Sequence, residues 1–396
     1  MTSASQPQSG TGIILLALAM GGFSIGTTEF AAMSLVPYYS ADLGISEAEA
    51  SHAISAYALG VVVGAPLISA FGARMSRKRL LILLMLAFGL ANVLAALAPE
   101  YRSMVLFRFF SGVPHGAYFG VASLLAASLV PQNRRTWAVS RVMMGLTVAT
   151  VVGVPAASLM GQHLGWRWGF GVVGLLAMIT VTLLMRHAPD DRGDPTASPL
   201  SELSALGRRQ VWLTLLTGAV GFGGLFAVYT YVASTLLSVT QAPEWTVPVV
   251  LMIFGLGMLT GTVVVGRIAD RGLMRTAAGI IVTSFVMLMI YPMASGSVWT
   301  LAPTVFMIGA SGSLGLVLQT RLMDVAGRAQ TLAAALNHSA FNAANALGPW
   351  LASLAISAGY GFESSGYVGA ALAVCGLLML GISVWDQRRS EALSPC

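Results

Sequence analysis

Apolar runs of about twenty residues recur along the whole 396-residue chain, and they constrain its fold more than any other feature. As a helix, a run of that length crosses the ~30 Å hydrocarbon layer of a membrane. Inside lipid, backbone polar groups must find partners within the protein, so each run must be a helix or a strand of a closed barrel. The runs lack alternation of apolar and polar residues, which favours helices over barrel strands. The sequence therefore predicts an all-α integral membrane protein.

Twelve candidate spans can be counted, and one long polar stretch, residues 187–210, divides them into two sets of six. We expect two six-helix bundles, residues 12–186 and 211–385, joined by this cytoplasmic linker and flanked by polar tails at 1–11 and 386–396. The first set of spans covers residues 12–36, 48–71, 80–98, 103–130, 137–161 and 168–186, and the second covers residues 211–238, 246–266, 276–294, 300–321, 329–358 and 366–385.

Basic residues are placed in a pattern that predicts the orientation of the spans. Only 9% of the residues are charged, and most of the 21 Lys and Arg residues lie in alternate loops. Acidic residues such as Asp42 and Glu244 lie in the opposite loops. Because cytoplasmic loops carry the excess of Lys and Arg, both termini are expected in the cytoplasm. The net charge of +6 is thus a topology signal, and without a basic water-facing domain we expect no nucleic-acid binding.

The two halves share a repeated loop. The segment GARMSRKRLL after the second span corresponds to GRIADRGLMR after the eighth, so that Arg74 matches Arg271. In proteins with two such halves, a substrate site forms near the middle of the membrane, between the repeats. We therefore expect a central cavity that opens alternately to either side.

Five stretches, taken together and in this order, resemble a known family. They are TTEFAAMSLVP, ISAYALGVVVGAPL, RFFSGVPHGAYFGVASLLAASLV, GLTVATVVGVPAASLMGQHLGWRW and ALNHSAFNAANALGPW. Over nearly its whole length the chain resembles drug:proton antiporters of the major facilitator superfamily, and it is most similar to their arabinose-efflux-permease-like branch of sugar exporters. The resemblance implies twelve transmembrane helices in two pseudo-symmetric bundles. It also implies proton-coupled efflux of a sugar or drug-like molecule by alternating access.

The resemblance further implies a monomer in the bacterial inner membrane, whose partners are lipid, protons and a small-molecule substrate. A proton-driven importer of the same fold is the alternative. We expect no cofactor: the chain contains no G-x-x-x-x-G-K-[ST] loop for ATP, and its two cysteines, Cys375 and Cys396, lack metal-ligand spacing.

The loop motif of the superfamily combines a glycine with an Asp-Arg pair and further basic residues. It is complete after the eighth span, but Ala73 replaces the aspartate after the second. Either these residues control conformational change, or they only anchor the loops on the cytoplasmic side. The matching residues are Gly266, Asp270 and Arg271 in the second half and Arg74 and Arg77 in the first.

Gly145, Gly153 and Pro155 on the fifth span resemble the antiporter motif, although here the proline follows the glycine by two residues instead of one. Small residues let helices approach closely in lipid, and proline bends a helix by removing a hydrogen bond. The resemblance implies a role in setting the direction of transport. Ordinary helix packing is the alternative.

Glu29, in the segment GTTEFAAM, is the only acidic residue deep within a span. A charge at the centre of a membrane helix costs about 2.5–3.5 kcal/mol, and such residues usually mark ion or proton pathways. Removal from water also favours the neutral form of a carboxyl group. We expect Glu29 to take up and release protons or to contact substrate. The alternative is a structural carboxyl group that is locked by hydrogen bonds to Thr27, Thr28 or another helix.

Arg108 and His115 are seven residues apart on the fourth span and so share a helix face. The resemblance implies that Arg108 acts in proton transfer or holds the cavity, with Glu29 as a nearby partner. The alternative for Arg108 is a side chain that extends to the outer surface. His115 is a candidate to line the cavity, or to pack only.

His338, Asn342 and Asn345 are spaced i, i+4 and i+7 on the eleventh span and so form one polar stripe. Such a stripe either lines the cavity or joins neighbouring helices by hydrogen bonds. Tyr229 and Tyr231 lie on the seventh span, the second-half counterpart of the span that contains Glu29. They are candidates to bind substrate or to pack.

A remote alternative is an intramembrane serine protease. The segment GASG at 309–312 would supply Ser311 as the nucleophile and His338 as its base, which requires the two side chains to lie within hydrogen-bond reach. That chemistry needs neither twelve spans nor a repeated loop. We therefore expect a transporter and not an enzyme.

Overall fold

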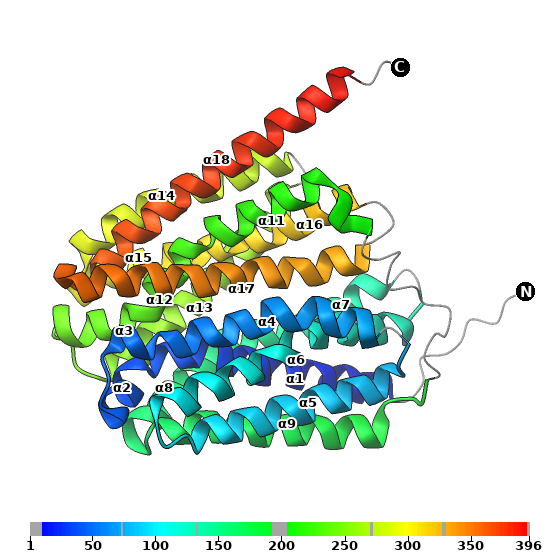
Figure 1. Cartoon of the computed structure of the whole chain (residues 1–396), viewed down its shortest axis with the longest axis horizontal. Coiled ribbons are helices and arrows are strands. Elements are labelled where there is room, and N and C mark those ends of the chain that lie inside the picture. The colour runs from blue at the N-terminus through cyan, green and yellow to red at the C-terminus, as the bar shows by residue number, and fades with distance from the viewer. Residues whose placement is uncertain are drawn as a thin grey trace, which may run out of the picture.

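The computed structural model describes residues 10–72, 74–131, 134–191, 204–269, 272–326 and 330–393, which form helices joined by short turns (Figure 1). In the first half the elements are α1 (Thr11–Ser34), α2 (Val36–Leu43), α3 (Glu47–Ala50), α4 (His52–Gly72), α5 (Arg77–Ala96), α6 (Tyr101–Ser128), α7 (Arg135–Val148), η2 (Ala149–Gly153), α8 (Val154–His163) and α9 (Trp166–His187). In the second half they are η3 (Ser204–Gly207), α11 (Arg209–Gly221), α12 (Gly223–Ser234), η4 (Thr235–Val239), α13 (Thr246–Ile268), α14 (Leu273–Ala294), α15 (Val298–Ala310), η6 (Ser311–Ser313), α16 (Leu314–Ala326), α17 (Gln330–Ala355), η7 (Ile356–Tyr360) and α18 (Ser364–Leu393).

Ten helical segments in the described ranges are long and apolar enough to cross a membrane. Two further helices, α6 and α17, have 28 and 26 residues but contain more polar side chains. Arg108 and His115 interrupt the apolar sequence of α6, and His338, Asn342 and Asn345 interrupt that of α17. With these two helices, each of the twelve predicted spans corresponds to helical structure. The predicted all-α membrane fold is confirmed.

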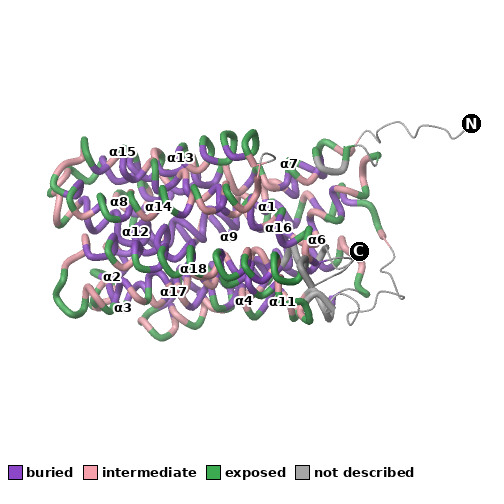
Figure 2. Tube along the Cα trace, turned by 90° about the horizontal axis from the view of Figure 1, so that it is seen from above, coloured by how far each residue is buried: buried purple, intermediate pink, exposed green. Residues whose placement is uncertain are grey.

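Large apolar side chains lie on the outside of the bundle. Leu16, Leu90 and Leu378 are each 60% exposed, and Figure 2 shows exposed segments around a buried interior. Such a surface is unfavourable in water but suits contact with lipid chains. By contrast, all twelve residues of α12 are buried, as are those of α1 from Ser24 to Ser34. These two helices therefore lie at the centre.

Some of the predicted spans are interrupted instead of forming one regular helix. The fifth consists of α7, the π turn η2 and α8, and the tenth consists of α15, the 3₁₀ turn η6 and α16. Pro155 accounts for the first interruption, because it is the second residue of α8 and has no N–H with which to continue the helical ladder. The wider π turn just before the proline accommodates this loss, and such turns occur frequently at functional sites.

The two halves meet through matching pairs of helices. α4 of the second span packs against α17 of the eleventh, α13 of the eighth packs against η2 and α8 of the fifth, and α1 packs against α12.

We call the end of the bundle that carries the loops with Arg74, Arg134 and Arg208 the basic end. Helix α1 begins there and α18 ends there, at the right of Figure 1.

Hydrogen bonds between the halves lie toward the end opposite the basic end. In the described part of the chain there are three: Ser55 Oγ donates to the Ala346 carbonyl oxygen (3.0 Å), Gln162 Nε2 donates to the Glu244 carbonyl oxygen (2.9 Å), and Ser234 Oγ donates to the Glu47 carboxylate. The halves are therefore fastened together at the end away from the basic loops.

Candidate functional site

Glu29 lies on α1 between the two halves. Its side chain is 1% exposed, so it points neither into lipid nor into open solvent. Oε2 lies 4.0 Å from Nε2 of His115 on α6, and Oε1 has no hydrogen-bond partner among the described residues. Thr27 donates to the backbone of its own helix and Thr28 donates to Asn92, so these two threonines do not form the lock that was the alternative for Glu29.

Arg108 is fully buried and does not extend to the outer surface. Its Nη1 donates to Thr28 Oγ1 (3.0 Å), and its guanidinium carbon lies 4.3 Å from the centre of the Tyr57 ring, which stabilises the cation. Thr28 in turn donates to Oδ1 of Asn92 on α5 (2.6 Å). No ion pair joins Arg108 to Glu29 within the described structure, and Nε and Nη2 of Arg108 have no hydrogen-bond partner there.

The crossing of α4 and α6 brings Tyr57 against His115. A side chain at Gly112 would collide with the carbonyl oxygen of Tyr57, so the two helices can approach this closely only because position 112 is glycine. Tyr57 OH lies 2.9 Å from Nδ1 of His115, whose side chain is 1% exposed. With Nδ1 bonded to Tyr57, the other ring nitrogen faces Glu29. We call Thr28, Glu29, Tyr57, Arg108 and His115 the central polar cluster.

His338 of α17 brings the second half to this cluster. Its ring stacks on Phe119 of α6, with centroids 5.1 Å apart and 3° between the ring planes. The centroid of His338 lies 6.1 Å from that of His115. His338 is partly exposed, unlike His115.

Asn342 and Asn345 continue the stripe along α17 and are fully buried. Asn342 Nδ2 donates to the carbonyl oxygen of His338 (3.0 Å), and the amide approaches the Glu29 carboxyl group closely enough to interact with it. Oδ1 of Asn342 and both amide atoms of Asn345 lack hydrogen-bond partners in the part of the chain that is described. The predicted stripe therefore faces the first half and retains unused hydrogen-bonding atoms.

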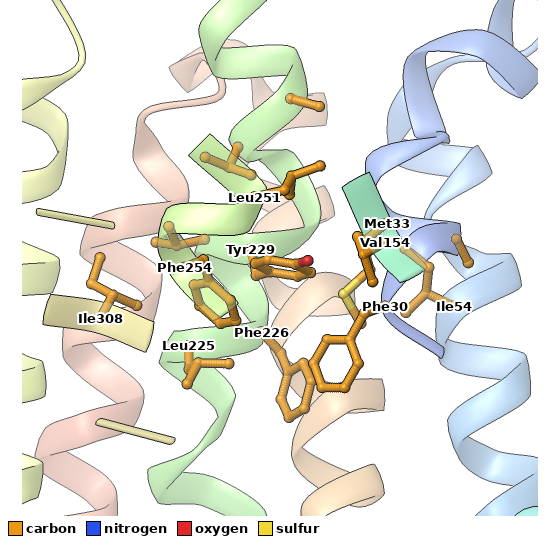
Figure 3. Packing of buried hydrophobic residues seen from close by; sticks show 14 of the residues in the cluster. Phe30, Met33, Ile54, Val154, Leu225, Phe226, Tyr229, Leu251, Phe254 and Ile308 are labelled. Carbon is orange, nitrogen blue, oxygen red and sulfur yellow. The ribbon is translucent and has the colours of Figure 1, made fainter. Parts of the chain in front are cut away.

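The two tyrosines of α12 lie in different surroundings. Tyr229 packs its ring against Phe254 (centroids 4.1 Å apart) and edge-on against Phe30 of α1 (5.7 Å), as Figure 3 shows. Its hydroxyl group has no partner among the described residues. Tyr231 instead packs on Phe362 within the second half (6.0 Å). Tyr229 therefore contacts α1 through Phe30, the residue that follows Glu29.

The glycines of the fifth span lie directly on α1. A Cβ atom at Gly145 would collide with the carbonyl oxygen of Ala19, and one at Gly153 would collide with Thr27. These small residues hold α7 and η2 close to the helix that carries Glu29. Helix packing is thus one use of the motif, and its directional role stays a prediction.

The structure describes both candidate residues of the first-half loop motif but only one of the three in the second half. Arg74 is exposed, and Arg77 is the first residue of α5. Gly266 is the last predicted motif residue before a gap, and Asp270 and Arg271 lie outside the described residues. A gate at the second-half loop therefore stays a prediction.

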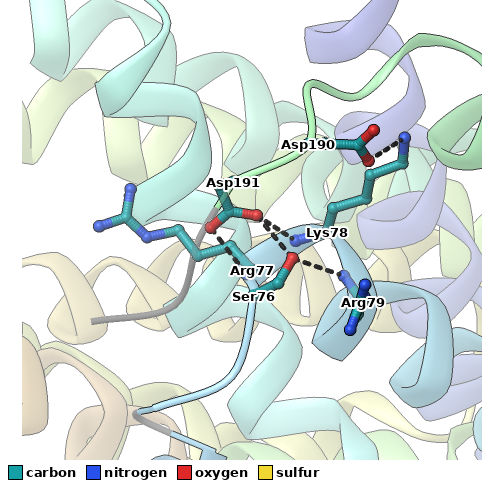
Figure 4. A network of polar contacts seen from close by, with 6 residues as sticks. All are labelled: Ser76, Arg77, Lys78, Arg79, Asp190 and Asp191. Atoms are coloured by element: carbon teal, nitrogen blue, oxygen red, sulfur yellow. Dashed lines mark hydrogen bonds and ion pairs between the residues drawn. The ribbon is translucent and has the colours of Figure 1, made fainter. Parts of the chain in front are cut away.

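Asp191, just beyond α9, caps the start of α5 (Figure 4). It accepts hydrogen bonds from Ser76 Oγ (2.7 Å) and from the backbone N–H groups of Arg77 (2.9 Å) and Lys78 (3.2 Å). Burial raises the pKa of Asp191, but these hydrogen bonds outweigh it and hold the pKa below its usual range. The linker thus supplies a carboxylate to the loop in which Ala73 replaces the expected aspartate.

Sequence reasoning missed Asp191, Tyr57 and Asn92. Asp191 lies 115 positions from its partner Ser76, and no local pattern joins the two. Tyr57 and Asn92 carry the signal that identified Glu29, a polar side chain within an apolar span, but without a charge.

The arrangement expected of a serine protease is not formed. Ser311 Oγ donates to the carbonyl oxygen of Ile308 on its own helix (2.6 Å), while His338 stacks on Phe119. No hydrogen bond joins Ser311 to His338 within the described ranges.

Known proteins resemble this chain over most of its length. The family model described as Major Facilitator Superfamily matches residues 18–331. The Escherichia coli K12 inner membrane transport protein YdhP is 38% identical over 375 residues, 94% of this chain and 96% of the relative. The chloramphenicol resistance protein of Streptomyces lividans is 33% identical, covering 85% of this chain and 88% of the relative. A probable sugar efflux transporter of Helicobacter pylori is 26% identical, covering 91% and 93%.

Solved structures share the fold. The crystal structure of a mutant of the nucleoside transporter NupG superimposes with a TM-score of 0.77 at 12% sequence identity, covering 93% of this chain and 99% of the other. At this level of sequence identity, the similarity shows a shared fold and nothing about the substrate.

Proposed function

Because this chain belongs to the Major Facilitator Superfamily of transporters, we propose that it exports a small organic molecule in exchange for protons. The glycine and proline pattern of the fifth span supports export, as do relatives named for chloramphenicol resistance and for sugar efflux. We place it in the bacterial inner membrane, to which its relative YdhP is assigned by name, with both termini in the cytoplasm.

The observation that carries the proposal is the Glu29 carboxyl group. It is buried between the halves, interacts with side chains of both, and has one oxygen without a hydrogen bond in the described structure. An incompletely paired buried carboxylate is unfavourable, so binding of a proton changes the free energy of this site strongly. A proton on Glu29 therefore shifts the balance between arrangements of the two halves.

Exchange follows from competition at Glu29. The ionised carboxylate accepts hydrogen bonds from a bound substrate, and the protonated group accepts fewer. Proton uptake on the outer side weakens substrate binding and favours release there, and proton loss on the inner side restores binding. Arg108 holds a permanent positive charge close to the site through both steps, because a guanidinium group does not lose its proton in proteins.

The surroundings favour a substrate with hydrogen-bonding groups and an apolar face. Asn342 and Asn345 offer amide atoms, Tyr229 offers a hydroxyl group, and Phe30 and Phe226 offer aromatic surface. A strongly cationic substrate would require more than one buried carboxylate. We propose neutral sugars or drug-like molecules as the substrate class.

Transport by purified protein in proteoliposomes tests the proposal. Radiolabelled chloramphenicol and a panel of labelled neutral sugars are the probes, and an imposed pH gradient is the driving force. Wild-type protein should accumulate at least one probe against its gradient. Glu29→Gln should abolish this accumulation, and any exchange of labelled for unlabelled probe that remains should need a higher probe concentration, because the neutral amide resembles the protonated carboxyl group. Accumulation by Glu29→Gln at the wild-type level would show that another group couples the proton.

The sign of the pH gradient separates export from import. An antiporter accumulates probe in vesicles that are acidic inside, because protons then flow out as substrate enters. A symporter accumulates probe in vesicles that are acidic outside. Accumulation under the second condition alone would replace the proposed efflux by the importer alternative.

A further inference from the structure

Two histidines join the buried Glu29 to a less buried part of the site. We propose that His115 and His338 form a proton relay that connects Glu29 with water on the side of the basic end. The relay rests on the proposed role of Glu29 as the proton-responsive group, and it adds the route by which the proton reaches that group.

The exposed fraction of each side chain and its position along the bundle both place His115 between Glu29 and His338. Glu29 and His115 are each 1% exposed, whereas His338 is partly exposed. α6 runs toward the basic end, so Phe119, four residues after His115, lies about 6 Å closer to that end. His338 stacks on Phe119 and belongs to the earlier part of α17, which starts at the basic end. The path from Glu29 through His115 to His338 therefore leads toward the basic loops.

The distances between the three side chains allow proton transfer after small rotations of those side chains. Glu29 Oε2 and His115 Nε2 are 4.0 Å apart, about 1 Å more than a hydrogen bond, which rotation of either side chain removes. The two imidazole centroids are 6.1 Å apart, which ring rotation or one bridging water spans. Proton transfer by positioned side chains works through direct contact or a single water.

Each step conserves the proton. The Glu29 carboxyl group gives its proton to Nε2 of neutral His115, which leaves a carboxylate and an imidazolium. The imidazolium passes one proton to neutral His338, and His338 releases it to water. The reverse sequence protonates Glu29. Imidazole suits this task because one ring nitrogen can accept a proton while the other carries one.

The charges around the two histidines disfavour a proton that stays on either of them. Arg108 and His115 both contact Tyr57, so the guanidinium charge repels an imidazolium at position 115 and disfavours a proton that stays there. Tyr57 bonds to Nδ1 and leaves Nε2 to face Glu29. α17 contains no Asp or Glu that would trap a proton at His338.

Time-resolved infrared spectroscopy after a pH jump tests the relay without a substrate. The signal is the carbonyl stretch of the protonated carboxyl group that disappears in Glu29→Gln. His115→Gln and His338→Gln should each slow its appearance by about tenfold or more and leave its final amplitude unchanged. His52→Gln is the matched control, because His52 bonds to Tyr101 within the first half and should leave the rate unchanged.

The outcomes distinguish the two proposals. A wild-type spectrum without a band that depends on Glu29 would overturn the proposed function. A band that appears at the wild-type rate in both histidine variants would overturn the relay alone. Variants that fail to fold would be recognised by their thermal unfolding, and His115→Asn and His338→Asn, which keep a smaller polar side chain, would then decide by the same rate.

Discussion

Gly145 on α7 lies so close to the carbonyl oxygen of Ala19 on α1 that no Cβ atom fits between the two backbones. The contact joins the fifth span to the first, and the first span carries Glu29. Its energetic weight can be measured by adding one methyl group.

Gly145→Ala is expected to destabilise the protein by about 1–3 kcal/mol, because the new methyl group forces the two helices apart. Thermal unfolding in detergent measures the loss. Gly171→Ala is the matched control, since a Cβ atom at that helical position meets nothing within 4 Å. It should be neutral or slightly stabilising. Equal effects of the two substitutions would show that the contact with Ala19 is unimportant.

Thr28→Val should destabilise the protein by about 1–3 kcal/mol, because it leaves the buried Nη1 of Arg108 and the Oδ1 of Asn92 without their partner. Thr27→Val provides the comparison: Thr27 is also buried, but its hydroxyl group bonds only to the backbone of its own helix. Denaturation of the two variants under the same conditions measures the difference. If Thr27→Val is as damaging as Thr28→Val, the network around Arg108 contributes nothing specific.

Asp191→Asn should destabilise the protein at neutral pH by about 0.5–2 kcal/mol, the range for loss of a helix cap. The hydrogen bonds depress the pKa of Asp191, so its contribution is complete above the unfolded value of about 3.9 and is lost as the pH falls through the folded value. The difference in melting temperature between wild type and Asp191→Asn should therefore shrink in acid. Asp190→Asn serves as control, because its carboxylate is 95% exposed and pairs only with Lys78. A difference that is constant over pH would contradict the assignment.

A disulfide between Glu47→Cys and Ser234→Cys should stop transport, because these positions join the two halves at the end opposite the basic end. Reduction should restore it. The background variant carries Cys375→Ser and Cys396→Ser. The comparison pair is Gly218→Cys with Ala340→Cys, which join α11 to α17 within the second half. A Cβ atom at Gly218 would lie 3.5 Å from that of Ala340, a separation that a disulfide spans, and oxidation should leave transport unchanged. Full transport by the oxidised first pair would mean that this contact does not open during the cycle.

The sequence was sufficient for the fold class because twelve long apolar runs leave a membrane chain few alternatives. It was also sufficient to single out Glu29, Arg108 and His115 as candidates, because charged or titratable side chains are conspicuous in apolar spans. It did not separate Tyr229 from Tyr231, which differ by two positions and therefore point to different sides of α12.

Contacts between residues that are far apart along the chain could not be predicted from the sequence. Nothing near Ser76 indicates that Asp191 caps the same helix, and nothing near His115 indicates that Tyr57 bonds to it. The breaks inside the fifth and tenth spans were hidden as well, because apolar content is the same in a π turn as in an α-helix.

The charges at the centre of this molecule are distributed unequally. Glu29 and Arg108 both belong to the first half, and the second half contributes amides, a histidine and aromatic rings. Under the proposed mechanism, substitutions in α12, and in α17 away from His338, can therefore change which substrates the carrier accepts and leave proton coupling intact. Diversification of cargo within such a lineage should accumulate in the second half, and the first half should change slowly.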